Sequence, residues 1–335
     1  MRNNRVGPNR LTFSTAPRPN GLLFGSAPNY DGSMSDTPHP PLTFRALYDS
    51  PILRVRDYTC RASRGGPAAE EYSDGNNIVL MRHGAFCKHF GRRTVTADVN
   101  QAVFFSNESI YRVSHPADCG DRGTTFFVNP RVLSDIIREL DPAADDRPHR
   151  PFPFVTGPCD TKAFWRHREF VQRLESAENR PLEPIWADVT ALQLIADILA
   201  AAFQRRSPPR KRRRPGTVDD HADRVEAAKT YLASRLGERV MLDEVARAVH
   251  LSPFHFARVF QARAGLPVHR YLTRLRLRAA LDRLIDGARD LTALALQLGF
   301  SSHSHFSDAF RAEFGRAPSE IRRSALRELS KNLEV

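Results

Sequence analysis

Apolar and polar positions alternate in short runs between Leu42 and Val128, and residues that favour turns separate the runs. A period of two residues is typical of β-strands with one face in a core. The runs predict strands at Ile52–Tyr58, Ile78–Met81, Ala85–Phe90, Arg93–Ala97, Ala102–Ser106, Ile110–Ser114 and Thr124–Val128. Turn formers lie between them at Gly65-Gly66, Asp74-Gly75, Asn107 and Asp121–Gly123. Many short strands at this spacing predict a β-sandwich or a small barrel.

Two segments further along the chain change to a helical period. They run from about Thr161 to Ala177 and from about Ile185 to Gln204, and Asn179–Pro184 connects them. Apolar residues of the second segment recur at Ile185, Val189, Leu192, Ile195, Leu199 and Phe203. The pair predicts an αα-hairpin with more apolar surface than two helices can bury alone. It therefore packs on the β domain or pairs with a second copy of the chain.

The C-terminal part of the chain contains one pattern twice. The first copy comprises Leu242–Val249, a turn at His250-Leu251, then Ser252–Phe260 and Gly265. The second comprises Leu291–Leu298, a turn at Gly299-Phe300, then Ser302–Phe310 and Gly315. A small residue, Ala246 or Ala295, stands in each first helix where a second helix must cross closely. Each copy therefore predicts a helix-turn-helix unit.

The turns and helix ends of the two copies support this prediction. Gly299 permits the positive φ of a tight turn, and His250 occupies the equivalent place with more strain. The candidate N-caps are Ser252, followed by Pro253, and Ser301 or Ser302. Gly265 and Gly315 suit the helix C-termini.

The second helices carry paired aromatic residues, and a long helix connects the two units. Residues four apart share one helix face, so four phenylalanines are expected to face the core of their own unit: Phe256, Phe260, Phe306 and Phe310. The segment Val268–Ile285 predicts a stiff helix that fixes the separation of the two units. Both could then enter successive major grooves, about 34 Å apart.

The net charge of the chain indicates what kind of partner it could bind. The formal net charge of the 335 residues is +12, and the sequence pI is about 10.1. Such an excess favours a polyanionic partner, although solubility alone accounts for a basic chain. Residues 1–41 predict a disordered basic tail, with arginines at Arg2, Arg5, Arg10 and Arg18. Residues 206–217 predict an extended Pro/Arg linker, either solvated or in contact with phosphates.

Cysteine usage and hydropathy indicate a cytoplasmic chain. The four cysteines (Cys60, Cys87, Cys119 and Cys159) form no C-x-x-C pair, so a zinc ribbon or thioredoxin-like motif is not expected. The sequence shows no N-terminal signal-like segment and no run of eighteen apolar residues. A membrane partner is therefore not expected, nor is any cofactor.

The duplicated segment resembles the AraC/XylS family of transcription regulators over about residues 218–325. The resemblance rests on Ser252-Pro253-Phe254, Phe260, Gly265, Tyr271, Arg276, Ala280, Leu284, Ala295, Gly299-Phe300, His305-Phe306, Phe310-Arg311, Phe314-Gly315 and Pro318. It implies an α+β, multidomain fold with a cupin-like β-barrel sensor domain at 42–158. The implied fold continues with a dimerising helical hairpin at 159–205, an all-α DNA-binding domain at 218–325 and a C-terminal tail at 326–335. The run Asn100–Phe105, followed by Tyr111–Pro116, resembles such a sensor.

The resemblance further implies which side chains meet DNA. In the first unit these are Ser252, Pro253, Phe254, Ala257, Arg258 and Gln261, and in the second Ser302, His303, Ser304, Ser307, Asp308 and Arg311. Arg258 is suited to the guanine O6/N7 edge, and Phe254 and Ala257 to thymine methyls. Asp308 departs from the family pattern, because a carboxylate repels phosphate even where it accepts from cytosine N4. Arg311, Arg274, Arg276 and Arg278 are expected to meet phosphates or neighbouring acids, and His305 to be structural.

Three kinds of signal remain open for the sensor domain. A metal could be bound by His83, His89, His115 and Cys119, although no clustered cupin motif supports it. Redox sensing could use Cys87 and Cys119, whose basic neighbours Lys88 and Arg122 could lower a thiol pKa. An organic effector could lie near Phe86, Phe104, Tyr111 and Phe127, which are more often core residues.

The sequence thus predicts a homodimeric regulator that binds double-stranded DNA and is modulated by a small-molecule effector. It would contact RNA polymerase if it is an activator. One alternative is a constitutive DNA-binding protein whose β domain only dimerises. A remoter one is a metal-dependent cupin enzyme fused to a DNA-binding domain. Neither a P-loop, a G-x-S-x-G nor a dinucleotide glycine pattern occurs, so the chain is not expected to be an enzyme.

Overall fold

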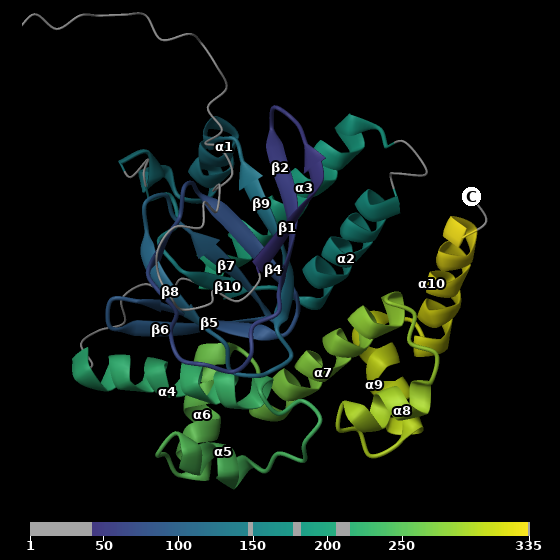
Figure 1. Cartoon of the computed structure of the whole chain (residues 1–335). Coiled ribbons are helices and arrows are strands. Elements are labelled where there is room, and N and C mark those ends of the chain that lie inside the picture. The colour runs from purple at the N-terminus through teal and green to yellow at the C-terminus, as the bar shows by residue number, and fades with distance from the viewer. Residues whose placement is uncertain (1–41, 147–149, 177–181, 206–214, 334–335) are drawn as a thin grey trace, which may run out of the picture.

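The computed structural model describes residues 42–146, 150–176, 182–205 and 215–333 (Figure 1). The predicted basic tail, residues 206–214 of the predicted linker and residues 179–181 of the predicted hairpin connection lie outside these residues. The β-rich part lies above a group of helices in Figure 1, with α2 and α3 along one side of the sheets.

Two antiparallel sheets form the N-terminal part of the fold. The larger has the strand order β1-β2-β9-β4-β7-β10 and the smaller β3-β8-β5-β6. The strands are β1 (Leu42–Asp49), β2 (Leu53–Cys60), β3 (Glu71–Tyr72), β4 (Asn77–His83), β5 (Ala85–Phe90), β6 (Arg93–Asp98), β7 (Gln101–Phe105), β8 (Ile110–Ser114), β9 (Asp121–Val128) and β10 (Thr156–Pro158). This arrangement, with the helices that follow, confirms the predicted combination of a cupin-like β domain and an all-α C-terminal domain.

All seven predicted strands are present, and the bounds predicted for β5 and β8 match the structure. The elements β1, β3, β10 and helix α1 (Pro130–Leu140) were not predicted. β10 is short and contains Gly157 and Pro158, which are poor strand formers. A start signal for α1 was present, because Asn129 caps the helix and Pro130 stands in its first turn. The 3₁₀-helix η1 (Pro142–Asp146) follows α1.

The predicted helical hairpin is formed by α2 (Thr161–Glu175) and α3 (Pro184–Arg205), and it packs on the β domain. The ring centroids of Phe126 on β9 and Phe170 on α2 are 6.2 Å apart. At the other helix, a Cβ added at Gly157 would lie 2.6 Å from the side chain of Ala202. Glycine thus permits β10 and α3 to approach closely, and one of the two predicted placements of the hairpin is confirmed.

Among the described helices, α3 is the one whose length and apolar composition would suit a membrane span. Seven of its residues are buried: Ala187, Ala191, Leu194, Ile195, Ile198, Leu199 and Ala202. They lie on the face that packs against β10, α1 and α2. The apolar composition of α3 is therefore accounted for by packing within this chain.

The C-terminal part contains seven described helices. They are α4 (Pro215–Ala233), α5 (Leu242–Ala248), α6 (Pro253–Ala264), α7 (Val268–Ile285), α8 (Leu291–Gln297), α9 (His303–Phe314) and α10 (Pro318–Leu333). The bounds of α7 match the prediction, and α7 joins the pair α5–α6 to the pair α8–α9 (Figure 1). The two pairs are built alike. Phe256 and Phe260 meet at a centroid distance of 5.6 Å and an angle of 64°, and Phe306 and Phe310 repeat both values.

Candidate nucleic-acid interface

The second helix of each pair begins and ends in the same way. Ser252 and Ser302 occupy the N-cap positions of α6 and α9 with extended backbone. The Oγ of Ser302 accepts from the backbone N–H of His305 at 3.1 Å, whereas Ser252 makes no such capping bond. Gly265 and Gly315 end the helices with φ of 75° and 70°, which confirms the predicted glycine C-termini.

Exposure along the two helices repeats residue for residue from Ser252 to Ala262 and from Ser302 to Ala312. The exposed positions include these predicted DNA contacts: Ser252, Pro253, Phe254, Arg258, Gln261, Ser302, His303, Ser304, Asp308 and Arg311. The two remaining predicted contacts, Ala257 and Ser307, are half-buried at equivalent positions. Each helix therefore presents one polar face to solvent and holds the opposite face in its own core.

The exposed face of α6 combines an aromatic ring with a cation. Phe254 is 74% exposed, so it contributes little to the core of its own unit. The guanidinium carbon of Arg258 lies 5.7 Å from the centre of that ring. The exposed face of α6 therefore offers both apolar surface and a positive charge.

On the exposed face of α9, an acidic residue forms an ion pair with an arginine of the same helix. Asp308 lies 4.0 Å from Arg311, one turn along, and both side chains are mostly exposed. Ser307 Oγ lies 3.5 Å from His303 Nε2 on the same face. His305 is exposed, and its Nδ1 lies 3.1 Å from Ser301 Oγ. α9 is thus less cationic than α6.

Three of the arginines of α7 contact other parts of the protein. Arg274 pairs with Glu313 at 2.8 Å, and a neighbouring acid was one of its two predicted partners. Arg276 instead donates to three backbone carbonyls, those of Leu236, Glu238 and Gly299. Arg278 is fully buried and donates to the carbonyl of Val99 on the β domain. The expectation of phosphates or acids is therefore wrong for Arg276 and Arg278, which hold the turns and the domains together.

A second set of buried polar contacts joins α7 to the β6–β7 turn. The Tyr271 hydroxyl donates to Asp98 Oδ2 at 2.6 Å, and Asn100 Nδ2 donates to the Tyr271 carbonyl at 3.3 Å. Burial and the neighbouring carboxylate raise the pKa of Tyr271 well above its usual value. Burial also raises the pKa of Asp98. The phenol therefore stays a donor, and the pair fixes α7 to the β domain.

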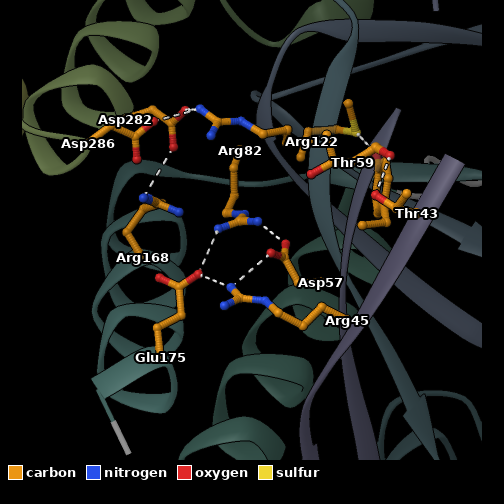
Figure 2. Close-up of polar contacts among 12 residues, drawn as sticks. Thr43, Arg45, Asp57, Thr59, Arg82, Arg122, Arg168, Glu175, Asp282 and Asp286 are labelled. Atoms are coloured by element: carbon orange, nitrogen blue, oxygen red, sulfur yellow. Dashed lines mark hydrogen bonds and ion pairs between the residues drawn. The ribbon is translucent and has the colours of Figure 1, made fainter. Parts of the chain in front are cut away.

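Figure 2 shows an ionic cluster at the other end of α7. Asp282, 2% exposed, accepts from Arg122 of β9 at 2.6 Å and faces Arg168 of α2 at 3.2 Å. Arg122 also reaches Asp286 at 2.8 Å. Helix α7 is thereby held by cations from strand β9 and helix α2.

The charges continue along α2 towards the sheet edge (Figure 2). Arg82 of β4 bonds Asp57 of β2, and Arg45 of β1 reaches both Asp57 and Glu175. Burial and the neighbouring Arg168 lower the pKa of Arg82 to about 10. The cluster as a whole therefore ties the larger sheet to α2 and α7.

A cavity of about 290 Å³ lies between the two sheets. Phe86, Tyr111 and Phe127, three of the four aromatic residues considered for an effector, line it. Phe104, the fourth, instead packs on Phe154 at a centroid distance of 4.8 Å. Its neighbour Phe105 lines the cavity, because successive strand residues point to opposite faces.

The predicted metal set does not come together. His83 Nδ1 lies 3.9 Å from Asp282, while His89 bonds Thr94 and Ser114. Among the described residues, the group of potential ligand atoms close enough to share an ion contains only His115 of that set. The prediction of a metal site made of His83, His89, His115 and Cys119 is therefore wrong.

The two cysteines considered for redox sensing are not activated. Burial raises the pKa of the Cys87 thiol, which contacts Thr230 of α4 at 3.4 Å. Burial also raises the pKa of Cys119. The expected lowering of a thiol pKa by Lys88 and Arg122 is wrong, since Arg122 is paired with acids and Lys88 is itself buried.

Two helix-turn-helix units with exposed second helices, joined by α7, define a double helix-turn-helix DNA-binding protein with a β-rich N-terminal domain. A family model described as "Helix-turn-helix domain" matches residues 245–324. The HTH-type transcriptional activator RhaS of Escherichia coli O1:K1 / APEC is 33% identical over 257 residues, which cover 76% of this chain and 87% of RhaS. The chain belongs to the AraC/XylS family of transcription regulators.

Solved structures with some likeness to the chain include two regulators. ToxT from Vibrio cholerae is 11% identical, with a TM-score of 0.31, over 81% of this chain and 98% of that one. An AraC-type transcriptional regulator from Chromobacterium violaceum is 27% identical, with a TM-score of 0.29, over 30% of this chain and 91% of that one.

Proposed function

We propose that this transcription regulator reads DNA with the exposed faces of α6 and α9, placed in successive major grooves. The observation that carries this proposal is the repeated exposure pattern of the two helices, which leaves equivalent polar positions open to solvent on both. The connecting helix α7 is anchored by buried contacts, so it acts as a spacer of fixed length. Adjacent major grooves on one DNA face lie about 34 Å apart.

Within this proposal, α6 supplies most of the base discrimination. Arg258 is available to bond the O6 and N7 atoms of guanine, and Phe254 and Ala257 present apolar surface to thymine methyls. Ser252, Pro253 and Gln261 flank them. On α9 the contacts with DNA come from Ser302, His303, Ser304 and Ser307. Asp308 pairs with Arg311 and thereby weakens the attraction of this helix for phosphates.

The sensor domain is proposed to regulate this reading. The cavity between the sheets suits a small organic effector, because aromatic rings line it beside a few polar groups. Strand β9 contributes Phe127 to the cavity and Arg122 to the contact with Asp282. A ligand that shifts β9 would therefore shift α7 and the helices it joins. As an activator in the cytoplasm, the protein would also contact RNA polymerase.

The rival proposal is a constitutive DNA-binding protein whose β domain only dimerises. The two differ in one measurable respect, since only the regulated protein changes its affinity for DNA when the cavity is filled. Absence of enzymatic activity remains a prediction for either.

The DNA reading is tested by selecting bound sequences from random duplex DNA with the full chain. We expect two sequence boxes separated by about one helical turn. Arg258→Ala should lose preference at one base pair and cost about 1–3 kcal/mol. Arg131→Ala, an exposed arginine of α1, is the control and should change nothing. Equal weakening on every sequence would make Arg258 a phosphate contact and refute the assignment.

Dimerisation is proposed through the outer face of α3. Ile185 is 72% exposed and Val189, one turn on, is 46% exposed, so an apolar stripe remains after the hairpin has packed. The double variant Ile185→Asp, Val189→Asp should sediment as a monomer and lose affinity for paired sites. Ile110→Asp, an exposed apolar residue of β8, is the control. A double variant that still sediments as a dimer would exclude this face.

A further inference from the structure

Three potential ligand side chains meet at one edge of the sensor cavity. Cys60 ends β2, Asp121 begins β9, and the two are paired in register across the sheet. His115 follows β8 and is brought to them by the loop between β8 and β9. Gly120 of this loop has φ of 63°, and a Cβ there would clash with the Cys60 carbonyl oxygen. A glycine is therefore required for the loop to close on Cys60.

The three ligand atoms have the spacing of a metal site. The Sγ of Cys60 lies 3.5 Å from His115 Nε2, and Asp121 Oδ2 lies 2.9 Å from the same nitrogen. All three atoms lie within 4.8 Å of one another. Tetrahedral bonds of about 2.3 Å to sulfur and about 2.0 Å to nitrogen place those two atoms about 3.5 Å apart. The triangle thus needs little adjustment to surround an ion.

Hydrogen bonding alone leaves this cluster incomplete. One ring nitrogen, Nε2 of His115, faces both a sulfur and a carboxylate oxygen, yet it carries at most one proton. Asp121 Oδ2 is buried, and its contact with His115 Nε2 at 2.9 Å is not a well-aligned hydrogen bond. A buried carboxylate oxygen with poor hydrogen bonding is costly. A cation bound between the three ligand atoms would contact each of them.

The three ligand side chains lie away from bulk water. Their exposed fractions are 6% for Cys60, 11% for His115 and 2% for Asp121. Burial of all three side chains limits competition from bulk water for their ligand atoms.

We propose that Cys60, His115 and Asp121 bind a divalent ion of the zinc type. A sulfur, an imidazole and a carboxylate ligand together favour such a borderline ion over magnesium or calcium, which prefer oxygen. All three residues line the cavity between the sheets, so a fourth coordination position opens towards it. Three protein ligands and one open position allow water or a small anionic molecule to complete the site.

The test titrates the reduced, metal-free full chain with Co²⁺, a spectroscopic probe for zinc sites. We expect one equivalent to bind with a thiolate-to-cobalt charge-transfer band, and Zn²⁺ to abolish the band. Cys60→Ser should remove the band, and Asp121→Asn should weaken binding at least about tenfold. Cys119→Ser and Cys87→Ser are the matched controls and should retain it. A missing band, or one that survives Cys60→Ser, would overturn the proposal.

A second measurement on the unaltered chain covers the case in which a variant fails to fold. Zn²⁺ should slow alkylation of Cys60 at least about tenfold while leaving the more exposed Cys119 unchanged, as followed by mass spectrometry of peptides. Equal alkylation of Cys60 with and without Zn²⁺ would show that the cluster is a hydrogen-bonded group only. Neither measurement involves DNA, so failure here is distinct from failure of the proposed function.

Discussion

Asp282 and Arg122 form an ion pair of 2.6 Å between residues that lie 160 positions apart in the chain. The aspartate belongs to the helix that spaces the two reading units, and the arginine to a strand of the sensor sheet. Arg168 of the hairpin, 3% exposed, faces the same carboxylate at 3.2 Å. One buried side chain of α7 thus meets both a strand of the larger sheet and helix α2, and it is one of the contacts that hold α7 in place.

Removing this carboxylate should destabilise the protein strongly. Asp282→Ala leaves Arg168 buried without its acid, and breaking a buried pair in this way costs about 3–5 kcal/mol. The free energy of unfolding, from urea denaturation, measures the loss. Asp286→Ala is the matched control, because Asp286 meets Arg122 but is 47% exposed, so its removal should cost less than about 1 kcal/mol. Equal losses for the two variants would show that burial does not set the strength of the contact.

Lys88 should make stability rise with pH. Its Nζ donates to the Phe104 carbonyl at 3.2 Å inside the sensor domain, and burial lowers its pKa from 10.5 to about 7. Between these values the unfolded chain binds a proton that the folded chain does not, so the free energy of unfolding increases with pH. Below about pH 7 both states are protonated and the contribution is flat.

The comparison with Lys88→Met isolates this effect, since methionine has a similar shape and no charge. The stability of the wild type minus that of the variant should rise from about pH 7 to about pH 10, by at most about 1.4 kcal/mol per unit. Urea denaturation at several pH values measures it. Parallel curves for the two proteins would mean that Lys88 keeps its ordinary pKa, held by its contact with the Phe105 ring at 3.5 Å.

Asp308 is expected to weaken DNA binding rather than to read a base. Its partner Arg311 is 62% exposed and becomes available to a phosphate when the carboxylate is removed. Asp308→Asn should therefore bind all sequences more tightly and steepen the slope of log affinity against log salt by about 0.9. Asp135→Asn removes a similar exposed pair, with Arg138, from the sensor domain and should leave the slope unchanged. Loss of preference at a single base pair would instead make Asp308 a reader of cytosine.

The repeated unit could be predicted from the sequence because its signals are local. Gly299, the phenylalanines four apart and the glycine C-termini each act within a few residues, and all take their predicted places. The seven strands were likewise indicated by alternation over short runs. β10 was missed because its three residues are too few to show an alternation of apolar and polar positions. The strand is defined by its pairing with β7.

The contact between the two parts could not be predicted, because its partners lie far apart in sequence. Arg278 and Asp282 look like the solvated positions of an amphipathic helix, yet both are buried beneath the sensor domain. One signal was available, since they stand four apart and so share a face of α7. The ligand cluster was missed for the same reason. Cys60 and Asp121 are neighbours only through the register of β2 and β9.

The two helix-turn-helix turns allow a test within a single chain. His250 and Gly299 occupy equivalent places with φ of 55° and 74°. A Cβ at Gly299 would lie 2.7 Å from Arg276 Nη2 and 3.0 Å from the Leu236 carbonyl oxygen, in addition to the cost of a left-handed backbone. Gly299→Ala should therefore lower the free energy of unfolding by more than about 1 kcal/mol.

The reciprocal change, His250→Gly, should leave stability within about 0.5 kcal/mol of the wild type. It relieves the left-handed strain of a side chain but adds the conformational entropy of glycine to the unfolded state, and the two effects nearly cancel. Urea denaturation of both variants measures the asymmetry. If Gly299→Ala were as stable as the wild type, Arg276 would have to move away from the turn to make room for the methyl group. The three carbonyl contacts of Arg276 would then not be what fixes the second unit.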